Sequence, residues 1–176
     1  MYRVERDWEA HGLRCVVIMT DMGHRCGYVG VDGKHPLYGM DYNDHLPAKY
    51  HYMWEEVREG SVGKRGILDL LTLDYENPRV GDLFDVHGGI TFSGGQPDYP
   101  VQAELWWFGY DCAHAEDARD LSEIPDPRLR RIYERFPDGG EIRSLEYCVG
   151  ECEGLAEHLS RLEGHPTEQA KRAGSA

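Results

Sequence analysis

The sequence predicts a single α+β domain, in which a mainly antiparallel sheet carries a long C-terminal amphipathic helix on one face. Three features support this fold class: an early hairpin pattern, two apolar segments in the middle of the chain, and one helical stripe near its end. We place the domain at residues 1–166 and expect residues 167–176, which are small and polar, to form a disordered tail.

The hairpin pattern lies near the start of the chain. Residues 14–20 (RCVVIMT) and 25–31 (RCGYVGV) are apolar runs on either side of Asp21, Met22 and Gly23. Two such runs around a short glycine-containing turn predict a β-hairpin. Residues 1–12 are polar, and we expect them to form a short arm outside the sheet.

Two apolar segments, residues 81–93 and 103–117, organise the middle of the chain. Residues 105–110 are almost without polar positions, which favours a central strand covered on both faces. The turn-rich residues 94–100 suit a hairpin connection between the two segments. We expect an antiparallel register in which facing residue numbers add up to roughly 196, so that His87 lies opposite residues 109–111.

Two helices are predicted around the middle of the chain, and one short segment stays ambiguous. Residues 48–59 have apolar positions three and four apart and precede Gly60, as a helix with a glycine cap would. Residues 67–73 (ILDLLTL) fit a strand or a helix equally well. Asp126 and Pro127 are typical of a helix start and predict a short helix that ends at Phe136.

The last predicted helix begins at Ser144 and ends before Gly164 and Pro166. Its apolar positions alternate three and four apart and form one stripe: Leu145, Cys148, Cys152, Leu155, Leu159 and Leu162. Gly150 and Gly154 each disfavour the helix by about 1 kcal/mol relative to Ala. We therefore expect a close backbone contact at these two glycines.

The charge balance excludes several kinds of partner. The chain has 32 acidic and 19 basic residues, for a net charge of −13. This acidity argues against nucleic acid and against anionic membranes as partners, because both repel an acidic surface. No apolar run approaches the roughly 20 residues that span a bilayer. An acidic protein that blocks the basic surface of a host protein remains open as an interpretation.

The five cysteines predict a reducing compartment. They are odd in number, contain no CxxC pair, and follow an N-terminus that does not begin as a secretory signal. We therefore expect a cytoplasmic protein. Cys148 and Cys152 lie on the apolar stripe, so we expect them to be buried structural thiols and not metal ligands.

The strongest candidates for chemistry follow the central strand. Asp111, His114 and Asp117 recur every three residues, so one helical turn would direct all three to a common side. The predicted hairpin adds His87. Two imidazoles and two carboxylates are ligands of Zn, Mn or Fe, so a divalent metal is the cofactor these residues would bind. Such a metal could activate water for hydrolysis.

The same region also permits readings without a metal. The backbone N–H groups of Gly88 and Gly89 could bind an anionic or carbonyl oxygen, and an aromatic side chain, Trp106, Trp107 or Tyr110, could stack on a ring. With His87 and His114 as donors, these groups would form a pocket for a nucleotide-like ligand.

A purely structural role is a further alternative. Asp111 could instead cap a helix that starts at Cys112 or Ala113, and His114 could hydrogen-bond a carboxylate inside the fold.

Four segments resemble a family of small uncharacterised proteins encoded by bacteriophages and prophages. They are Gly27-Tyr28-Val29, residues 35–39 (HPLYG), residues 86–94 (VHGGITFSG) and residues 107–117 (WFGYDCAHAED). The likeness extends over about residues 26–162 and includes the final helix. The resemblance implies a phage or prophage accessory protein that acts in the cytoplasm of the bacterial host. It implies no particular activity.

Together these observations predict a polar site at the end of the central hairpin that binds a small polar ligand or a metal. The ligand-binding candidates are His87, Gly88, Gly89, Trp107, Tyr110, Asp111, His114 and Asp117, and the metal candidates are His87, Asp111, His114 and Asp117. Three functions fit such a site or its surroundings: a metal-dependent hydrolase, a protein that sequesters a nucleotide-like ligand, and an acidic inhibitor of a host protein.

Overall fold

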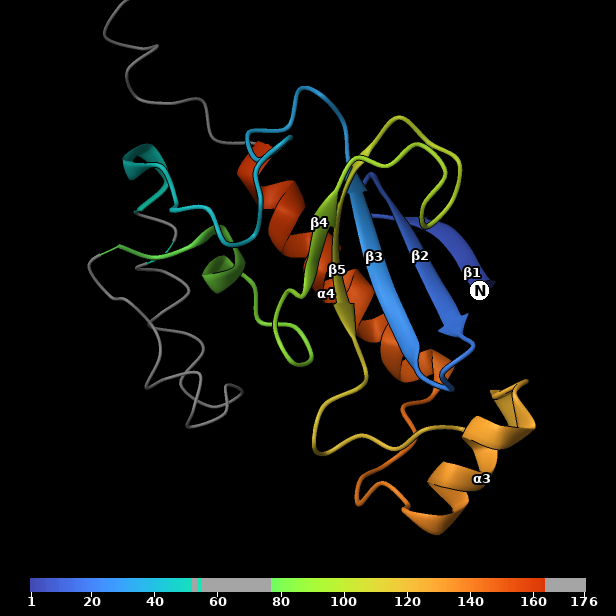
Figure 1. Ribbon diagram of the computed structural model, residues 1–176. Coiled ribbons are helices and arrows are strands. Elements are labelled where there is room, and N and C mark those ends of the chain that lie inside the picture. The colour runs from blue at the N-terminus through green and yellow to red at the C-terminus, as the bar shows by residue number, and fades with distance from the viewer. Residues whose placement is uncertain (52–53, 55–76, 164–176) are drawn as a thin grey trace, which may run out of the picture.

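The computed structural model describes residues 1–51, 54 and 77–163 of the chain. A five-stranded antiparallel sheet has the order β1-β2-β3-β5-β4, with the long helix α4 packed against it (Figure 1). The predicted α+β class is therefore confirmed. The strands are β1 Tyr2–Ala10, β2 Leu13–Thr20, β3 Arg25–Val31, β4 Phe92–Gly94 and β5 Trp106–Asp111. The longer helices within the described residues are α3 Pro127–Arg135 and α4 Leu145–Glu163.

Strands β2 and β3 form the predicted hairpin, with Val16 opposite Tyr28. The expected N-terminal arm was wrong, because residues 2–10 form strand β1 along the outer edge of β2. An edge strand exposes most of its side chains, so a polar sequence is compatible with it. Two of its carboxylates are also paired within the sheet: Glu5 Oε2 lies 2.6 Å from Arg25 Nε, and Asp7 Oδ2 lies 2.7 Å from Arg14 Nη2.

Strand β5 lies between β3 and β4 and is buried on both faces, as predicted. The preceding segment differs from the prediction, because only residues 92–94 form a strand and residues 80–83 form a 3-10 helix. Phe92 pairs with Gly109, whereas the predicted register would have placed Glu104 opposite it. Residues 84–91 form no strand, although the Thr91 N–H still donates to the Gly109 carbonyl of β5 at 2.9 Å.

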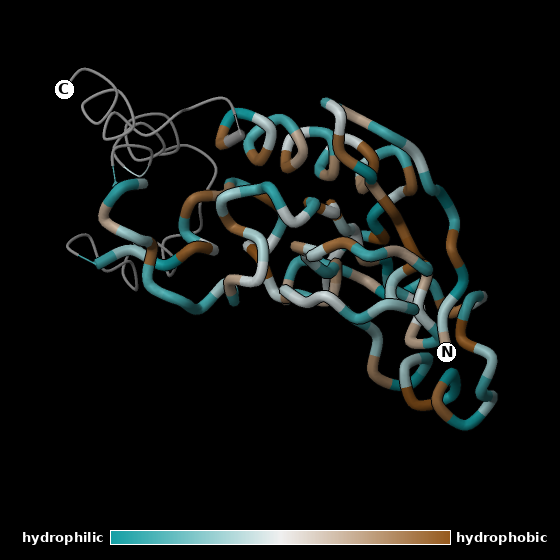
Figure 2. Tube along the Cα trace, turned by 90° about the horizontal axis from the view of Figure 1, so that it is seen from above, coloured by the Kyte–Doolittle hydropathy of each residue, from teal (hydrophilic) through white to brown (hydrophobic). Residues whose placement is uncertain are grey.

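Two apolar clusters cover the two faces of the sheet. One lies beneath α4 and includes Val17, Val29, Phe108 and Leu155. The other includes Trp107 and Tyr28 and is covered by the connection between β4 and β5, which contributes Tyr99, Val101, Ala103 and Leu105. Figure 2 shows hydrophobic positions recurring along α4, in agreement with its packed face.

The predicted stripe on α4 is confirmed, since Cys148, Cys152, Leu155, Leu159 and Leu162 are buried. The close contact expected at the two helix glycines is not found among the described residues: a β-carbon at either would meet no atom of them within 4 Å beyond the helix's own backbone. The close approach occurs instead at Gly27 of β3. A β-carbon there would lie 2.4 Å from the Tyr110 ring and 2.6 Å from Cys152 Sγ.

Of the remaining predicted helices, the structure describes α3 in full and only the start of the helix predicted at residues 48–59. Helix α3 has the expected start, because the Asp126 side chain accepts a hydrogen bond from the Arg128 N–H at 2.7 Å. Residues 48–50 form a 3-10 turn at the start of the predicted helix 48–59. Most of that helix, the segment 67–73 and the tail 167–176 lie outside the described residues. No helix in the described part of the chain has the length and apolar character needed to cross a membrane.

Candidate functional site

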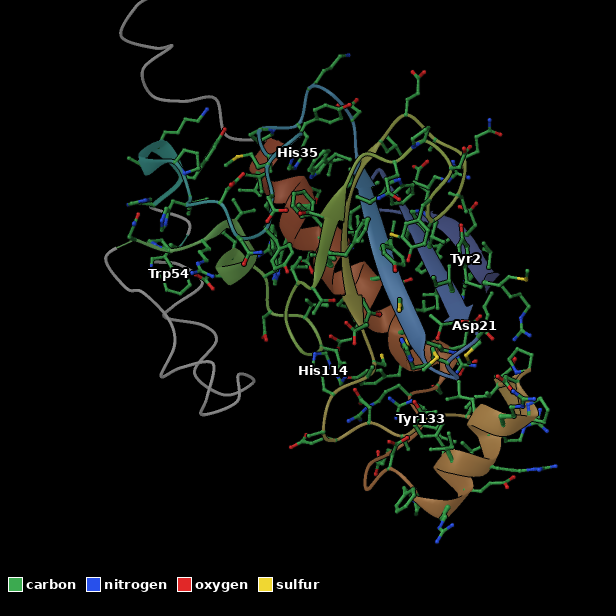
Figure 3. The ribbon with its side chains drawn as sticks, in the orientation of Figure 1. Tyr2, Asp21, His35, Trp54, His114 and Tyr133 are labelled. Carbon is green, nitrogen blue, oxygen red and sulfur yellow. The ribbon has the colours of Figure 1, made fainter. Side chains whose placement is uncertain are left out.

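Three segments meet near the end of β5: the loop 84–91, the turn 111–117, and the start of α4 together with the residues just before it. Figure 3 places His114 beyond the end of β5, beside the loop that precedes β4. Each segment contributes polar side chains to this place. The structure therefore brings three of the predicted residues, His87, His114 and Asp117, together at this end of the sheet.

The loop 84–91 turns sharply at His87. The Gly89 N–H donates to the Val86 carbonyl at 2.9 Å, and Gly88 has a φ of +66°. A positive φ at the third residue is the mark of a type II turn, and glycine adopts it without steric strain. The His87 N–H donates to the Glu151 carboxylate at 2.7 Å. This hydrogen bond joins the loop to α4 and explains why His87 does not pair with β5.

The imidazole of His87 has a partner at each nitrogen. Its Nε2 lies 2.8 Å from Asp117 Oδ2, and its Nδ1 lies 3.0 Å from the Tyr147 hydroxyl. The hydroxyl can donate or accept, so it fits either tautomer of the ring. These two contacts hold the plane and the direction of the imidazole.

Asp117 is the centre of the site, and its side chain is only 2% exposed. Its Oδ1 accepts from Arg143 Nε at 2.7 Å, and its Oδ2 accepts from the His114 N–H at 2.9 Å as well as from His87. Burial by itself would raise the pKa of this carboxyl, but the hydrogen bonds from Arg143 and His87 outweigh it and lower the pKa. Asp117 is therefore a carboxylate at neutral pH.

Arg143 reaches Asp117 because the chain just before α4 pairs with the turn. The Ala118 N–H donates to the Glu141 carbonyl at 2.8 Å, and the Glu141 N–H donates to the Glu116 carbonyl at 3.1 Å. This short parallel bridge brings Arg143 beside the turn. In return, its hydrogen bond to Asp117 raises the pKa of the guanidinium.

The His114 ring lies on Gly88 and beside the His87 ring. The two imidazole centroids are 5.5 Å apart and their planes meet at 75°. The side chain is 36% exposed, whereas its Nδ1 is shielded from solvent and has no hydrogen-bond partner among the described residues. That Nδ1 lies 3.6 Å from Asp117 Oδ2, which is too far for a hydrogen bond.

His87, His114 and Asp117 each offer a ligand atom, and these atoms lie within 4.8 Å of one another. Asp111, the fourth predicted metal ligand, lies outside that set, with its Oδ1 3.9 Å from His114 Nδ1. Its Oδ2 accepts from the Thr91 hydroxyl and its Oδ1 from the Ala113 N–H. No helix follows Asp111, so the alternative of an N-cap was wrong: its side chain closes a turn.

Three of the predicted ligand contacts are not part of this site. Trp107 is fully buried in the cluster on the opposite face of the sheet. Tyr110 is also buried, and its hydroxyl donates to the Cys148 carbonyl at 2.7 Å. Neither ring face is open to a ligand. The Gly89 N–H is occupied by the Val86 carbonyl, so it is not an anion donor.

Arg143, Tyr147 and Glu151 are site residues that the sequence reasoning did not identify. Tyr147 and Glu151 lie one turn apart on α4 and outside its apolar stripe. A polar pair with this spacing, near the start of a helix that packs on the sheet, is the signal that could have identified them. Arg143 gives no local signal, because its place depends on the bridge at Glu141.

Two thiols lie in the core beneath the site. Cys112 Sγ and Cys148 Sγ are 3.7 Å apart, and both side chains are buried. All five cysteines are free and buried, so the predicted burial of Cys148 and Cys152 is confirmed. The thiols therefore add no ligand to the site among the described residues.

Comparison of the chain with models of protein families, with curated proteins and with solved structures finds no match. The resemblance to phage and prophage proteins therefore stays a prediction.

Proposed function

We propose that this site binds one divalent transition-metal ion through His87 Nε2, His114 Nδ1 and Asp117 Oδ2. The observation that carries the proposal is the shielded Nδ1 of His114, which has no hydrogen-bond partner among the described residues and faces Asp117 Oδ2 at 3.6 Å. Two ligands of one tetrahedral Zn²⁺ are separated by roughly 3.3 Å, so this distance suits a shared ion better than a hydrogen bond. Two imidazoles and one carboxylate are ligands that Zn²⁺ accepts.

The groups behind the ligands support the same proposal. A histidine that binds a metal usually donates its other N–H to a neighbouring oxygen, and the Tyr147 hydroxyl is placed to accept from His87 Nδ1 at 3.0 Å. Arg143 holds Oδ1 of Asp117 and leaves Oδ2 directed at both histidines. The present 2.8 Å between His87 Nε2 and Asp117 Oδ2 would widen by a few tenths of an ångström around an ion.

We further propose that the bound metal activates water, which makes the protein a metal-dependent hydrolase. Three protein ligands leave one tetrahedral position open, as in catalytic zinc sites. The exposed side of the site is formed by His114 and Asp111, whose side chains are 36% and 30% exposed. Asp111 is the carboxylate on that side that would act as a base. In keeping with the resemblance, we place this activity in a phage or prophage accessory protein in the bacterial cytoplasm.

Sequestration of a nucleotide-like ligand is a weaker candidate. It depended on aromatic stacking by Trp106, Trp107 or Tyr110. Trp107 and Tyr110 are buried in the core. Trp106 begins β5, at the opposite end of the strand from the site, and its indole N–H donates to the Met40 carbonyl at 3.0 Å.

The first test is a calorimetric titration of the metal-free full chain with ZnCl₂, accompanied by a native mass spectrum. We expect one Zn²⁺ per chain, and loss of this binding in His114→Ala. A matched control is His45→Ala, because His45 is exposed and lies outside the site. The proposal fails if the wild type does not bind Zn²⁺, or if His114→Ala binds it as tightly as His45→Ala while both remain folded.

The hydrolase step has its own test. The zinc-loaded wild type and Asp111→Asn are assayed with a panel of nitrophenyl esters and nitrophenyl phosphates. We expect turnover that Asp111→Asn reduces while Zn²⁺ binding is retained. Zinc binding without turnover of any ester would contradict the hydrolase and leave the metal site standing.

A further inference from the structure

Helix α3 lies beyond the end of the sheet (Figure 1). None of its residues is buried. Its inner side is fixed by two contacts. The Arg119 guanidinium lies 4.3 Å from the centroid of the Tyr133 ring, and the Arg130 guanidinium donates to the Ile124 carbonyl at 2.7 Å and 3.2 Å. Figure 3 shows Tyr133 on the side of α3 that faces the rest of the molecule. The opposite side of the helix is therefore directed to solvent.

That outer side carries one continuous stripe, which we call the α3 stripe. Its members are spaced three and four residues apart and all are exposed: Arg128, Arg131, Ile132 and Arg135 on one face of the helix, and Phe136 directly after the last helical residue. Ile132 is 54% exposed and Phe136 is 67% exposed. Arg128 and Arg131 form no ion pair with any residue that the structure describes.

The charge of the α3 stripe is opposite to that of the chain. The protein carries a net charge of −13, whereas α3 has four arginines and a single glutamate. Arginine and large aromatic side chains are enriched in the parts of interfaces that contribute most to binding. The guanidinium group binds carboxylates through two parallel hydrogen bonds. Three such groups around two exposed apolar side chains form a surface suited to an acidic partner.

We propose that the α3 stripe is a docking site for an acidic protein segment, with carboxylates that pair with the arginines and an apolar side chain that packs on Ile132 and Phe136. This inference does not depend on the metal site. It also reverses the idea of an acidic inhibitor, because here the partner supplies the negative charge.

Other occupants fit the charges less well. A symmetric contact between two copies of α3 would place arginine against arginine. DNA, RNA and anionic membranes carry extended negative charge and would be repelled by the rest of this acidic chain. A short acidic segment avoids this cost, because charges beyond a Debye length of about 8 Å are largely screened at physiological salt.

The test is a selection from a display library of random twelve-residue peptides on the immobilised full chain. We expect enriched peptides that are rich in Asp and Glu and contain large apolar residues. Their affinity for Arg128→Glu/Arg131→Glu and for Ile132→Ser/Phe136→Ser should fall by at least about tenfold relative to the wild type. Rising salt should weaken the wild-type complex as well.

The matched control is Arg161→Glu, which reverses one exposed arginine near the end of α4. This variant should bind the same peptides as the wild type. Because the α3 stripe faces solvent, all variants should keep the circular dichroism spectrum of the wild type. The proposal is overturned if the enriched peptides have no excess of acidic residues, or if the α3 variants bind them as well as the control. Binding of phosphatidylglycerol vesicles or duplex DNA through α3 would overturn it too.

Discussion

The imidazole of His114 lies so close to Gly88 that a β-carbon at position 88 would fall 2.0 Å from Cε1 of the ring. Gly88 also has a positive φ of +66°. The neighbouring Gly89 has a φ of +80°, yet a β-carbon there would meet nothing within 4 Å. Substitutions at these two adjacent glycines therefore distinguish the effect of backbone strain from the effect of displacing the His114 ring.

Gly88→Ala and Gly89→Ala should differ in their effect on the metal site. Both variants force a β-carbon into the left-handed region, which costs about 1–2 kcal/mol of unfolding free energy. Gly88→Ala must in addition displace the His114 ring, so it should also weaken Zn²⁺ binding. Urea unfolding and zinc titration of both variants measure the two effects. Equal zinc affinity in the two variants would show that His114 does not need this position.

Tyr147→Phe should weaken Zn²⁺ binding by about 10- to 100-fold, the usual effect of removing a group that orients a metal ligand. The substitution removes the hydroxyl 3.0 Å from His87 Nδ1 and leaves the ring in place. A titration in competition with a chelator measures the affinity. Tyr38→Phe is the control, because Tyr38 is exposed and distant in sequence from the site residues. Unchanged affinity in Tyr147→Phe would mean that the hydroxyl does not orient His87 toward the metal.

The elements predicted correctly from sequence are those with a strong local signal, either an apolar stripe, a continuous apolar run or a helix-start motif. The stripe from Leu145 to Leu162 and the apolar runs of β2 and β3 specify a buried face, and the fold provides one for each. Strand β1 has no such signal. It lies at an edge, and its Asp7 and Glu5 pair with Arg14 of β2 and Arg25 of β3, which are partners that a local pattern does not contain.

The candidate site was predicted for its ligand types and only in part for its geometry. His114 and Asp117 lie together as predicted from their spacing, because residues three apart in a tight turn are close whether or not the turn is helical. His87 reaches Asp117 by a different route from the predicted hairpin, because its N–H is bound to Glu151 of α4. Contacts of this kind connect residues far apart in sequence, which explains why Arg143, Tyr147 and Glu151 were missed.

The five thiols should not react with a thiol reagent such as dithionitrobenzoate while the protein is folded. Each cysteine is buried, and burial raises the pKa of Cys15 and Cys26 to about 12, so both remain protonated at pH 8. Five thiols should be titrated once the protein is unfolded in guanidinium. If only three thiols are titrated after freshly purified protein is unfolded, Cys112 and Cys148, whose sulfurs are 3.7 Å apart, have formed a disulfide.

Asp138→Asn should lower stability at neutral pH and have little effect in acid. The Asp138 carboxylate accepts from Arg119 Nη1 at 2.6 Å and from the Arg119 N–H at 3.0 Å. Burial tends to raise the pKa of Asp138, but these hydrogen bonds outweigh it and lower the pKa below its ordinary value. We expect a loss of about 1 kcal/mol in unfolding free energy at pH 7.

The pH dependence follows from the direction of that pKa shift. A carboxyl whose pKa is lower in the folded protein stabilises the fold above the pKa of the unfolded chain, about 3.9 for Asp, and this contribution is lost as the pH falls through the folded value. The difference between wild type and Asp138→Asn should therefore stay constant from pH 7 to about pH 5 and close below pH 4. Urea unfolding at each pH measures it, with Asp98→Asn as the exposed control. Because Arg119 also stacks on Tyr133, the variant should loosen α3 as well. If the full stability difference between wild type and Asp138→Asn persists at pH 2, the ion pair is not its cause.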